Sequence, residues 1–450
     1  MMRSLYSGVA GLKVHQTRMD VIGNNIANVN TVGFKSQTVN FSELFYQTTQ
    51  AASGPNAETS TGGQNAKQIG LGVSVSSIST NITNEGGSQS TGNLYDLKIN
   101  GSSFFIIQQG GTNYYSKAGN FTTDGYGNLV TPSGGYVMGY TAARDAATGD
   151  MVLQTDQLRP ISVYGEEYMN TDPAQTTEVT MSGNINSEDD NFGVNAAGYV
   201  TTEMHVYDSL GNTYSVMFRI ENDDTDPTRY TMSPMAVYSG NTQLENVSAV
   251  ISGDDVTGDS LELVFDGTTG YLDMTAMTSQ NFTLNIVDDA NNQLASFAQD
   301  INVDFSGLKC MAANTDVVSE KGNADKLGTG KGVGTMIELG IQTDGKIVAS
   351  YDNGDTAVIG QILVASFANA AGLQKEGDNL FSSTLNSGDP NVKDITADGE
   401  TMSSGVLEMS NVDLADEFTN MIVTQRGYQA NSRIITTSDT MIEELLSLKR

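Results

Sequence analysis

Adjacent carboxylates are the side chains of this sequence that could most readily do chemistry. They occur at residues 223–226 (Asp-Asp-Thr-Asp), at Asp254 and Asp255, and at Asp288 and Asp289. Such groups could bind Ca²⁺ or act as general acid and base. None has the glycine and terminal glutamate of an EF-hand loop, and adjacent residues of a strand point to opposite faces. We therefore expect solvated loop carboxylates, with no metal site and no catalytic residues.

A glycine-rich segment and three isolated side chains are the remaining candidates. Residues 328–334 (Gly-Thr-Gly-Lys-Gly-Val-Gly) lack the spacing of a phosphate-binding loop, so a flexible turn is expected there. Cys310 is the single cysteine, which excludes an intramolecular disulfide. His15 and His205 are too few to build a His-rich metal site. The sequence thus predicts a protein that is not an enzyme and binds no cofactor.

The elements that must position side chains begin with one helix at each chain end. Apolar residues recur at seven-residue spacing in both places. The N-terminal line is Leu5, Leu12, Met19 and Ile26, widened by Ile22 and Val29, and the C-terminal line is Leu407, Leu414, Met421, Tyr428, Ile435 and Ile442. Such a repeat makes a seam along one side of a helix, and a seam needs a partner. We expect helices over 4–29 and from Leu414 onward, the second with Ser410 as N-cap and Asp413 three residues later.

Two arrangements of these helices remain open from the pattern alone: a helix hairpin within one monomer, or pairing between copies. Gly8, Gly11 and Gly23 each weaken the first helix by about 1 kcal/mol relative to alanine, so it should order only when packed. We interpret the two seams as a self-assembly surface. Its residues are Leu5, Leu12, Met19, Ile22 and Ile26 of the first helix and Leu414, Met421, Tyr428, Ile435 and Ile442 of the second.

Between the helices, the apolar period falls from seven to two, which is typical of strands. Turn-forming sequences at 124–128, 133–135 and 208–212 separate these runs, and 337–349 reads as a hairpin. The fold class is therefore multidomain and mainly β, with sandwich-like or barrel-like domains and terminal helices that pair as an inner coiled-coil domain. The expected organisation is nested: a helical polymerisation domain from 1–30 plus 411–450, an extended connector from 31–68 plus 383–410, an inner β domain from 69–144 plus 304–382, and an acidic outer β domain from 145–303.

The net charge of the chain makes two classes of partner unfavourable. The 53 acidic and 22 basic residues give a formal net charge of −31, which disfavours nucleic acid and anionic membrane surfaces. Between residues 145 and 303, 26 acidic residues face three arginines. No apolar run is long enough to span a bilayer, and charged residues interrupt any signal-peptide core near the N-terminus.

Two terminal motifs resemble those of the bacterial flagellar rod and hook family. The motif residues are Ala27, Asn28, Val29, Asn30, Thr31, Gly33 and Phe34 near the N-terminus and Gln425, Arg426, Tyr428, Gln429, Ala430 and Asn431 near the C-terminus. Internal blocks at 91–97, 118–121 and 380–381 are similar as well. The insertion of about 160 residues between the two β halves favours the hook members of the family over the shorter rod members.

The resemblance implies a structural subunit that assembles into a curved hollow tube. Such a tube acts as a universal joint and transmits torque from motor to filament. It further implies export through the flagellar secretion channel without a cleaved signal peptide, an extracellular location, and contacts with rod, hook-cap and hook–filament junction proteins. The alternatives are a distal-rod or hook-associated axial protein, or, in a different class, a β-rich surface adhesin that its terminal helices oligomerise.

Overall fold

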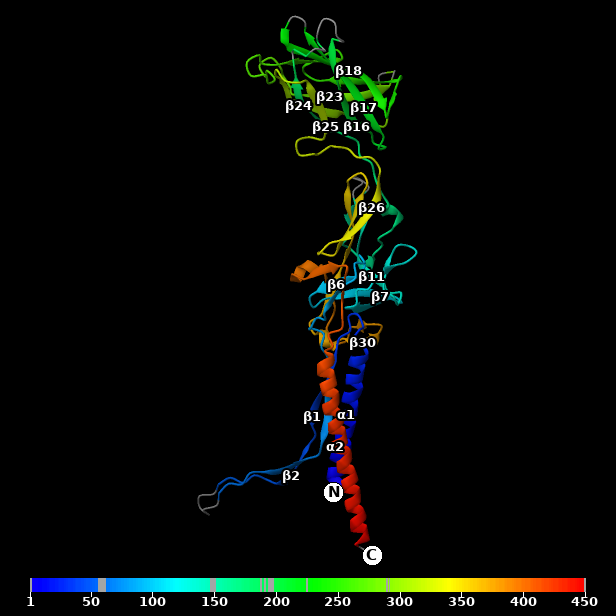
Figure 1. Ribbon diagram of the computed structural model, residues 1–450, viewed down its shortest axis with the longest axis vertical. Coiled ribbons are helices and arrows are strands. Elements are labelled where there is room, and N and C mark those ends of the chain that lie inside the picture. The colour runs from blue at the N-terminus through cyan, green and yellow to red at the C-terminus, as the bar shows by residue number, and fades with distance from the viewer. Residues whose placement is uncertain are drawn as a thin grey trace.

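The computed structural model shows an elongated chain with helices at one end and two β bodies stacked beyond them (Figure 1). It describes residues 2–55, 62–145, 151–186, 188–189, 192, 198–223, 226–288, 290 and 292–448. Both termini lie at the helical end, and a narrow β arm leaves the column beside the helices (Figure 1). The chain therefore runs out through the inner body to the outer body and returns through the inner body.

The helices α1 (Met2–Ala27) and α2 (Leu414–Ser447) lie at the expected places. The N-cap of α2 differs from the prediction: it is Asp413, whose carboxylate accepts hydrogen bonds from the amides of Ala415 and Asp416. A carboxylate at this position also interacts favourably with the positive end of the helix dipole. Leu407, predicted to continue the apolar line, lies before the helix in β34 (Val406–Glu408).

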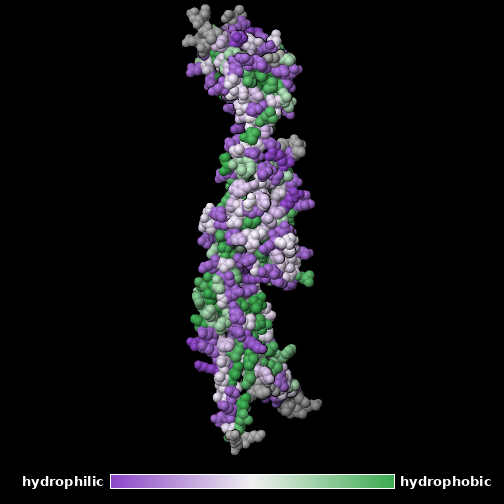
Figure 2. Space-filling model, turned by 90° about the vertical axis from the view of Figure 1, so that its right-hand side faces the viewer, coloured by the Kyte–Doolittle hydropathy of each residue, from purple (hydrophilic) through white to green (hydrophobic). Residues whose placement is uncertain are grey.

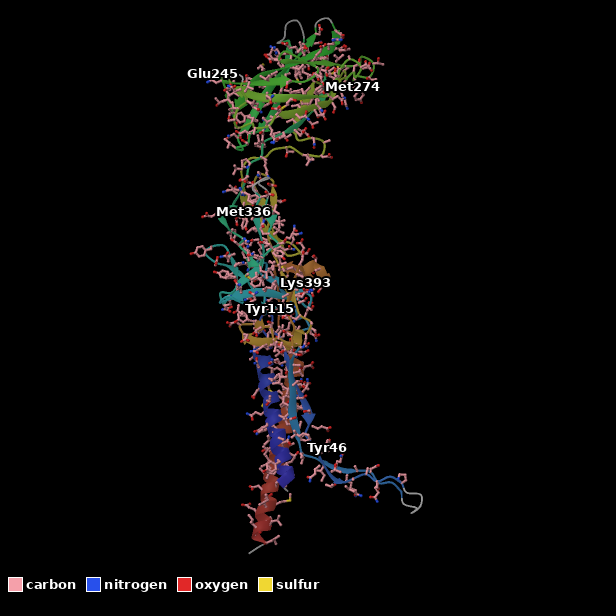
Figure 3. All side chains as sticks on the ribbon, turned by 180° about the vertical axis from the view of Figure 1, so that it is seen from behind. Tyr46, Tyr115, Glu245, Met274, Met336 and Lys393 are labelled. Atoms are coloured by element: carbon pink, nitrogen blue, oxygen red, sulfur yellow. The ribbon has the colours of Figure 1, made fainter. Side chains whose placement is uncertain are left out.

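The β arm occupies most of the first predicted connector. At its base, β1 (Gln37–Glu43) pairs antiparallel with β4 (Val73–Thr80), and farther out β2 (Tyr46–Gln50) pairs with β3 (Lys67–Gly70). Tyr46 marks the start of the outer part (Figure 3). The sequence predicted an extended connector here. The structure instead pairs the segment as strands, which satisfies the backbone of a stretch whose side chains are mostly small and polar.

The inner body is built around one large sheet and smaller pairs beside it. Its main path runs β14-β26-β27-β28-β11-β7-β8-β31-β30. The hairpin predicted over 337–349 is present as β26 and β27. The strands and short helices of this body are β5 (Ser88–Ser90), β6 (Leu97–Asn100), β7 (Phe104–Gln109), β8 (Thr112–Ser116), β9 (Thr122–Thr123), β10 (Leu129–Val130), β11 (Tyr136–Arg144), β12 (Met151–Leu153), β13 (Arg159–Pro160), η1 (Glu166–Tyr168), β14 (Asn170–Thr171), β26 (Gly334–Ile341), β27 (Lys346–Tyr351), β28 (Thr356–Ile362), β29 (Val364–Ser366), η3 (Ala370–Gly372), β30 (Gln374–Gly377), β31 (Leu380–Ser382), β32 (Asn391–Lys393), η4 (Ile395–Asp398), β33 (Thr401–Ser404) and β34.

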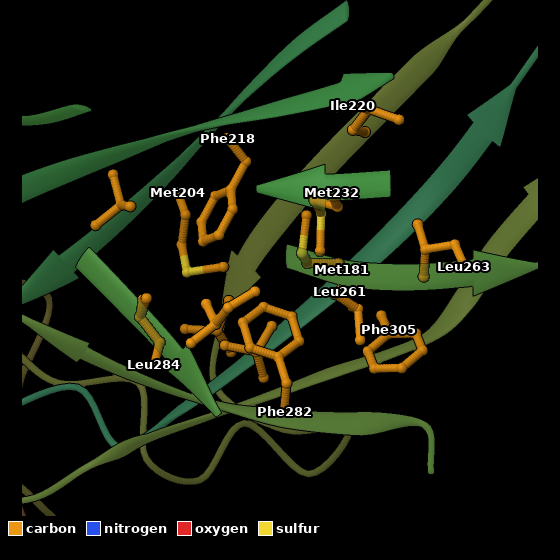
Figure 4. Packing of buried hydrophobic residues seen from close by; sticks show 14 of the residues in the cluster. Met181, Met204, Phe218, Ile220, Met232, Leu261, Leu263, Phe282, Leu284 and Phe305 are labelled. Atoms are coloured by element: carbon orange, nitrogen blue, oxygen red, sulfur yellow. The ribbon is translucent and has the colours of Figure 1, made fainter. Parts of the chain in front are cut away.

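The outer body is a sandwich of two sheets, ordered β20-β23-β24-β15-β25 and β16-β17-β18-β22-β21, with β19 beside β18. Its core lies between them: Met181, Phe282 and Phe305 come from the first sheet, and Met204 and Phe218 from the second (Figure 4). Glu245 and Met274 lie in this body, whereas Tyr115, Met336 and Lys393 lie in the inner one (Figure 3). Its strands are β15 (Glu178–Ile185), β16 (Tyr199–Tyr207), β17 (Thr213–Asp223), β18 (Asp226–Ser239), β19 (Thr242–Gln243), β20 (Val247–Ser252), β21 (Val256–Thr257), β22 (Ser260–Val264), β23 (Asn281–Asp288), β24 (Ile301–Cys310) and β25 (Asp316–Lys321).

Strand pairing shifts both boundaries of the outer body away from 145–303. Before it, β12 and β13 pair with β11, and β14 pairs with β26, so residues up to 171 belong to the inner sheet. After it, β24 and β25 flank β15, so residues up to 321 belong to the outer body. Charge composition marked the shift to an acidic stretch, but backbone hydrogen bonding decides where a domain ends.

The second predicted connector, 383–410, is also part of the inner body. Within it, β33 pairs with β6, β34 pairs with β5, and β32 pairs with β29. Ile395 and Met402 are fully buried in the inner core. The polar composition suggested a loop, yet two apolar side chains are enough to fix this segment on the sheet.

Candidate self-assembly surface

The adjacent carboxylates do not converge on a common site in the described residues. Asp255 accepts hydrogen bonds from the amides of Thr278 and Ser279, and Asp288 accepts them from Ala290 and Asn292. No group of three potential metal ligands occurs in the part of the chain that the structure describes. Asp224, Thr225 and Asp289 lie outside the described residues.

The other candidates for chemistry are likewise held by local contacts. Lys331 of the glycine-rich turn pairs with Asp355 at 2.6 Å. The Cys310 sulfur lies 3.6 Å from the hydroxyl of Tyr230. His205 lies 2.7 Å from the hydroxyl of Ser215. Among the described helices, none is long and apolar enough to cross a membrane.

The two terminal helices pack against each other in antiparallel fashion, as both structure views show (Figures 1 and 3). Polar contacts fix their register toward the inner body. Arg18 donates to the side chain of Asn420 at 3.1 Å, and Asn25 donates to Glu417 at 2.8 Å. These contacts join residues about 400 positions apart in the sequence, so the pair exists only when both chain ends are present.

Glycines allow the helices to approach closely at two reciprocal notches. A Cβ on Gly11 would lie 2.7 Å from the side chain of Asn431, and a Cβ on Gly427 would lie 2.6 Å from the ring of His15. Gly8 similarly faces Ile435 at 3.4 Å. Two of the three glycines that we expected only to weaken α1 therefore serve as packing positions. A side chain at either notch would require the Asn431 or His15 side chain, or the helices themselves, to shift.

The most buried stripe of the helix pair differs from the predicted seams. On α1, Val14, Ile22 and Asn25 are at most 4% exposed, whereas on α2 the buried residues are Thr424 and Ser438. Of the predicted seam residues, Leu5, Leu12, Met19, Ile26, Met421, Ile435 and Ile442 are half-buried, Leu414 and Tyr428 are exposed, and Ile22 alone is buried. Small residues make the contact because glycine, threonine and serine let the backbones approach, which leaves the larger apolar side chains at its edges.

Large apolar side chains remain exposed along the helices and the arm. They gather over the lower half of the space-filling view (Figure 2). On α2 they are Leu414, Phe418, Ile422, Val423, Tyr428, Ile434, Met441, Leu445, Leu446 and Leu448, and on the arm Phe41, Phe45, Tyr46, Ile69, Leu71 and Ile78. Exposed apolar side chains gathered in this way mark a surface that another molecule covers.

The N-terminal motif forms the junction between the helices and the inner body. Gly33 adopts a left-handed conformation (φ 67°), and a Cβ there would lie 2.6 Å from the amide nitrogen of Ala118. Lys35 pairs with Glu408 at 2.8 Å, with both side chains at most 1% exposed. Lys35 also donates to the carbonyl of Asn84. Segments from three parts of the sequence therefore meet at one buried ion pair.

The other N-terminal motif residues end α1 and direct the chain toward this junction. Ala27 is its last residue, Asn28 donates back to the carbonyl of Asn24, and Thr31 donates to Asn28 at 3.0 Å. Val29, Asn30 and Phe34 complete the turn, and the amide of Phe34 donates to Thr31. Asn411, just before α2, accepts from the amide of Ser36 at 2.8 Å.

The C-terminal motif residues lie mostly on the outward face of α2. Gln425, Arg426, Gln429 and Ala430 are exposed, and Arg426 donates to the side chain of Gln429 at 3.4 Å. Asn431 alone of this motif faces α1, where it fills the notch at Gly11. The outward set therefore has no structural role within one copy.

Comparison with known proteins places both motifs in one family. Three family descriptions match: "Flagella basal body rod protein" over residues 5–35, "Flagellar hook protein FlgE/F/G D1 domain" over 98–202, and "Flagellar basal body rod FlgEFG protein C-terminal" over 403–448. The flagellar hook protein FlgE of Borreliella burgdorferi is 37% identical over 100% of both chains. Those of Treponema pallidum and Escherichia coli are 34% and 32% identical, over 100% and 98% of both chains.

The chain belongs to the flagellar hook protein family. The family resemblance of the motifs is thereby confirmed, as is the mainly β fold with a helix at each end. Family membership favours a structural hook subunit over both the axial-protein and the adhesin alternatives. The roles of individual seam and motif residues stay predictions.

Two lysines at the junction of this hook-family chain are held in unusual surroundings. Burial lowers the pKa of Lys117 to about 8, although Glu408 partly opposes the shift. Its ammonium donates to the carbonyl of Gly101. Burial also lowers the pKa of Lys375 to about 8; this side chain donates to the carbonyl of Lys35. The junction therefore holds more buried positive charge than its single fully buried carboxylate compensates.

Sequence reasoning missed several residues that hold the hook-family chain together. Glu408 and Asn25 were not singled out, because a single polar residue beside an apolar strand or helix face gives no periodic signal. Gly427 lies opposite His15, and Gly11 lies opposite Asn431. On each helix the glycine is followed four residues later by the side chain that fills the notch of the other helix. Recognising this match requires the register of the pair, which the sequence does not supply.

Proposed function

We propose that this chain is the structural subunit of the flagellar hook and that it polymerises through its terminal helices into a curved hollow tube. In this role the tube is a universal joint that transmits torque from motor to filament. The observation that carries the proposal is full-length similarity to named hook proteins, together with exposed apolar residues on α2 that nothing in one copy covers.

The exposed residues give polymerisation an energetic basis. Phe418, Ile422 and Val423 are each at least 50% exposed on successive turns near the start of α2. Complete burial of such a side chain contributes roughly 1.5–3 kcal/mol. Part of that gain would offset the ordering of the helices and the loss of freedom on association.

The remaining partners follow from the place of a hook in the flagellum. We propose export through the flagellar secretion apparatus without a cleaved signal peptide, and an extracellular location. Rod, hook-cap and hook–filament junction proteins would be the axial partners. We propose neither nucleic acid nor a membrane as a partner, because the net charge of −31 repels anionic surfaces.

Removal of residues 435–450 tests the terminal-helix account. The truncated chain should remain a folded β monomer and form no tubes, because it loses Ile435, Ser438 and Ile442 from the helix pair. Removal of 51–66, which lies between β2 and β3 in the sequence, is the matched deletion of equal length. Electron microscopy would show tubes, discrete particles or neither; tubes from the 435–450 deletion would contradict the proposal.

A further inference from the structure

The imidazole ring of His15 lies where α2 has a glycine, Gly427, and therefore no side chain. It lies on α1 where the helix crosses Gly427 of α2, and a Cβ at 427 would lie 2.6 Å from its Cε1 and 2.7 Å from its Nε2. Phe41 of β1 packs edge-to-face on the imidazole, with ring centroids 6.1 Å apart. The α2 backbone and an aromatic side chain of the arm thus cover part of the ring, and His15 as a whole is half-buried.

This enclosure offers no group that would stabilise an imidazolium. The Nδ1 atom of His15 is buried and has no hydrogen-bond partner among the described residues. A protonated ring would therefore bring a charge and an N–H donor into a site that satisfies neither.

The charged residue nearest on α1 opposes protonation. Arg18 lies three residues on, and its guanidinium is 5.6 Å from the Phe41 ring and donates to Asn420. Burial first, and the Arg18 charge second, lower the pKa of His15 below its usual value of 6.5.

The charged groups of the other packed elements have their own partners. On α2, Arg426 is exposed and contacts Gln429. On β1, the Glu43 carboxylate accepts a hydrogen bond from the hydroxyl of Tyr46 at 2.6 Å. Neither side chain forms a hydrogen bond with the His15 ring among the described residues, so neither offsets the cost of charging the ring through direct contact.

We propose that His15 makes pairing of the terminal helices acid-sensitive: the neutral ring fills the notch at Gly427, and protonation drives it out and separates α1 from α2. The consequence for tubes rests on the proposed function, since those helices are its assembly surface. His15 binds a proton more tightly when the two helices are separated than when they are paired. The neutral ring therefore stabilises the helix pair fully above about pH 6.5, and this stabilisation is lost as the pH falls below that value.

Tube assembly by His15→Gln and His205→Gln variants tests this inference. His205 is the matched control, because it is the other histidine and its half-exposed side chain lies far away on β16. The critical monomer concentration is measured by sedimentation from pH 7.5 to 5.0. A single site changes it by at most about tenfold per pH unit. Wild type and His205→Gln should both show this rise in critical concentration as the pH falls, and His15→Gln should lack it.

The carboxylates of the chain affect all three proteins alike, so the comparison isolates His15. An unchanged pH dependence in His15→Gln would overturn the inference. A second measurement stands even if that variant fails to assemble: in His205→Gln, His15 is the only histidine, and its NMR titration midpoint in the folded monomer should lie below 6.5. A midpoint at or above 6.5 would overturn the inference, whereas absence of tubes from wild type at pH 7.5 would instead refute the proposed function.

Discussion

Replacement of Lys35 by methionine should destabilise the junction far more than an equivalent change at an exposed ion pair. Methionine preserves the unbranched apolar stem but leaves the Glu408 carboxylate charged at 1% exposure. Removal of one partner of a buried pair typically costs about 3–5 kcal/mol. Lys331→Met is the control: its pair with Asp355 is of similar length, 2.6 against 2.8 Å, but those side chains are 33% and 31% exposed. A pair of that kind contributes about 0–1 kcal/mol.

Hydrogen exchange of single amides measures these costs locally. The amide of Gly33 donates to the carbonyl of Glu408 at 2.8 Å, and that of Ala174 donates to the carbonyl of Lys331 at 2.9 Å. A cost of 3 kcal/mol corresponds to roughly a hundredfold faster exchange of Gly33 in Lys35→Met. Ala174 in Lys331→Met should change by less than about tenfold.

The double variant Lys35→Met with Glu408→Gln separates charge from packing. It should recover part of the loss, because the second substitution removes the unpaired buried charge. Similar exchange changes at the two ion pairs, or no recovery in the double variant, would refute the reasoning that burial gives the Lys35–Glu408 pair its importance.

Three further predictions concern the helices, the junction and the outer body. Gly23→Ala should stabilise α1 by about 1 kcal/mol, since nothing lies within 4 Å of the added Cβ, and circular dichroism measures this gain. Gly427→Ala should weaken tube assembly despite the same gain in helix propensity, and sedimentation measures this loss. Because the folded-state pKa of Lys117 is lowered to about 8, junction stability should rise as pH increases from about 8 toward 10, and urea unfolding should show a smaller rise in Lys117→Met. Residues 176–321 alone should unfold cooperatively, because both sheets of the outer body lie within them; a non-cooperative transition in urea would contradict this boundary.

The sequence predicted both helices, and the residues that it assigned to the self-assembly seams stay a prediction. A seven-residue line of Leu, Met and Ile residues locates a helix, yet the face that packs within one copy is chosen by backbone approach. Gly11 and Gly427 permit that approach, and nothing in the spacing of Leu12 or Met19 reveals it. Most of the predicted seam residues are only half-buried in one copy, so their further burial would require a second copy.

The β bodies were predicted in kind but not in extent. Alternation and turn signals identified the hairpin of β26 and β27 and the turn at 208–212, because these depend on local sequence. The assignment of β24 and β25 to the outer body depends on pairing with β15, more than 100 residues earlier. Polar composition likewise hid the arm and the segment containing β33, since strand pairing uses backbone groups that every residue carries.

The nested path of the chain imposes an order on its folding. The two sheets of the outer body come from a single uninterrupted stretch, whereas the inner sheet and the helix pair each need segments from both sides of it. When one body folds, it brings its two ends close together. The next body then joins segments separated by a shorter effective loop, so the entropic cost of its folding is lower. The chain should therefore consolidate from its tip toward its ends, with contacts such as Arg18 to Asn420 forming last. The helix pair, which is the proposed surface between copies, would thus form only after the outer and inner bodies have folded.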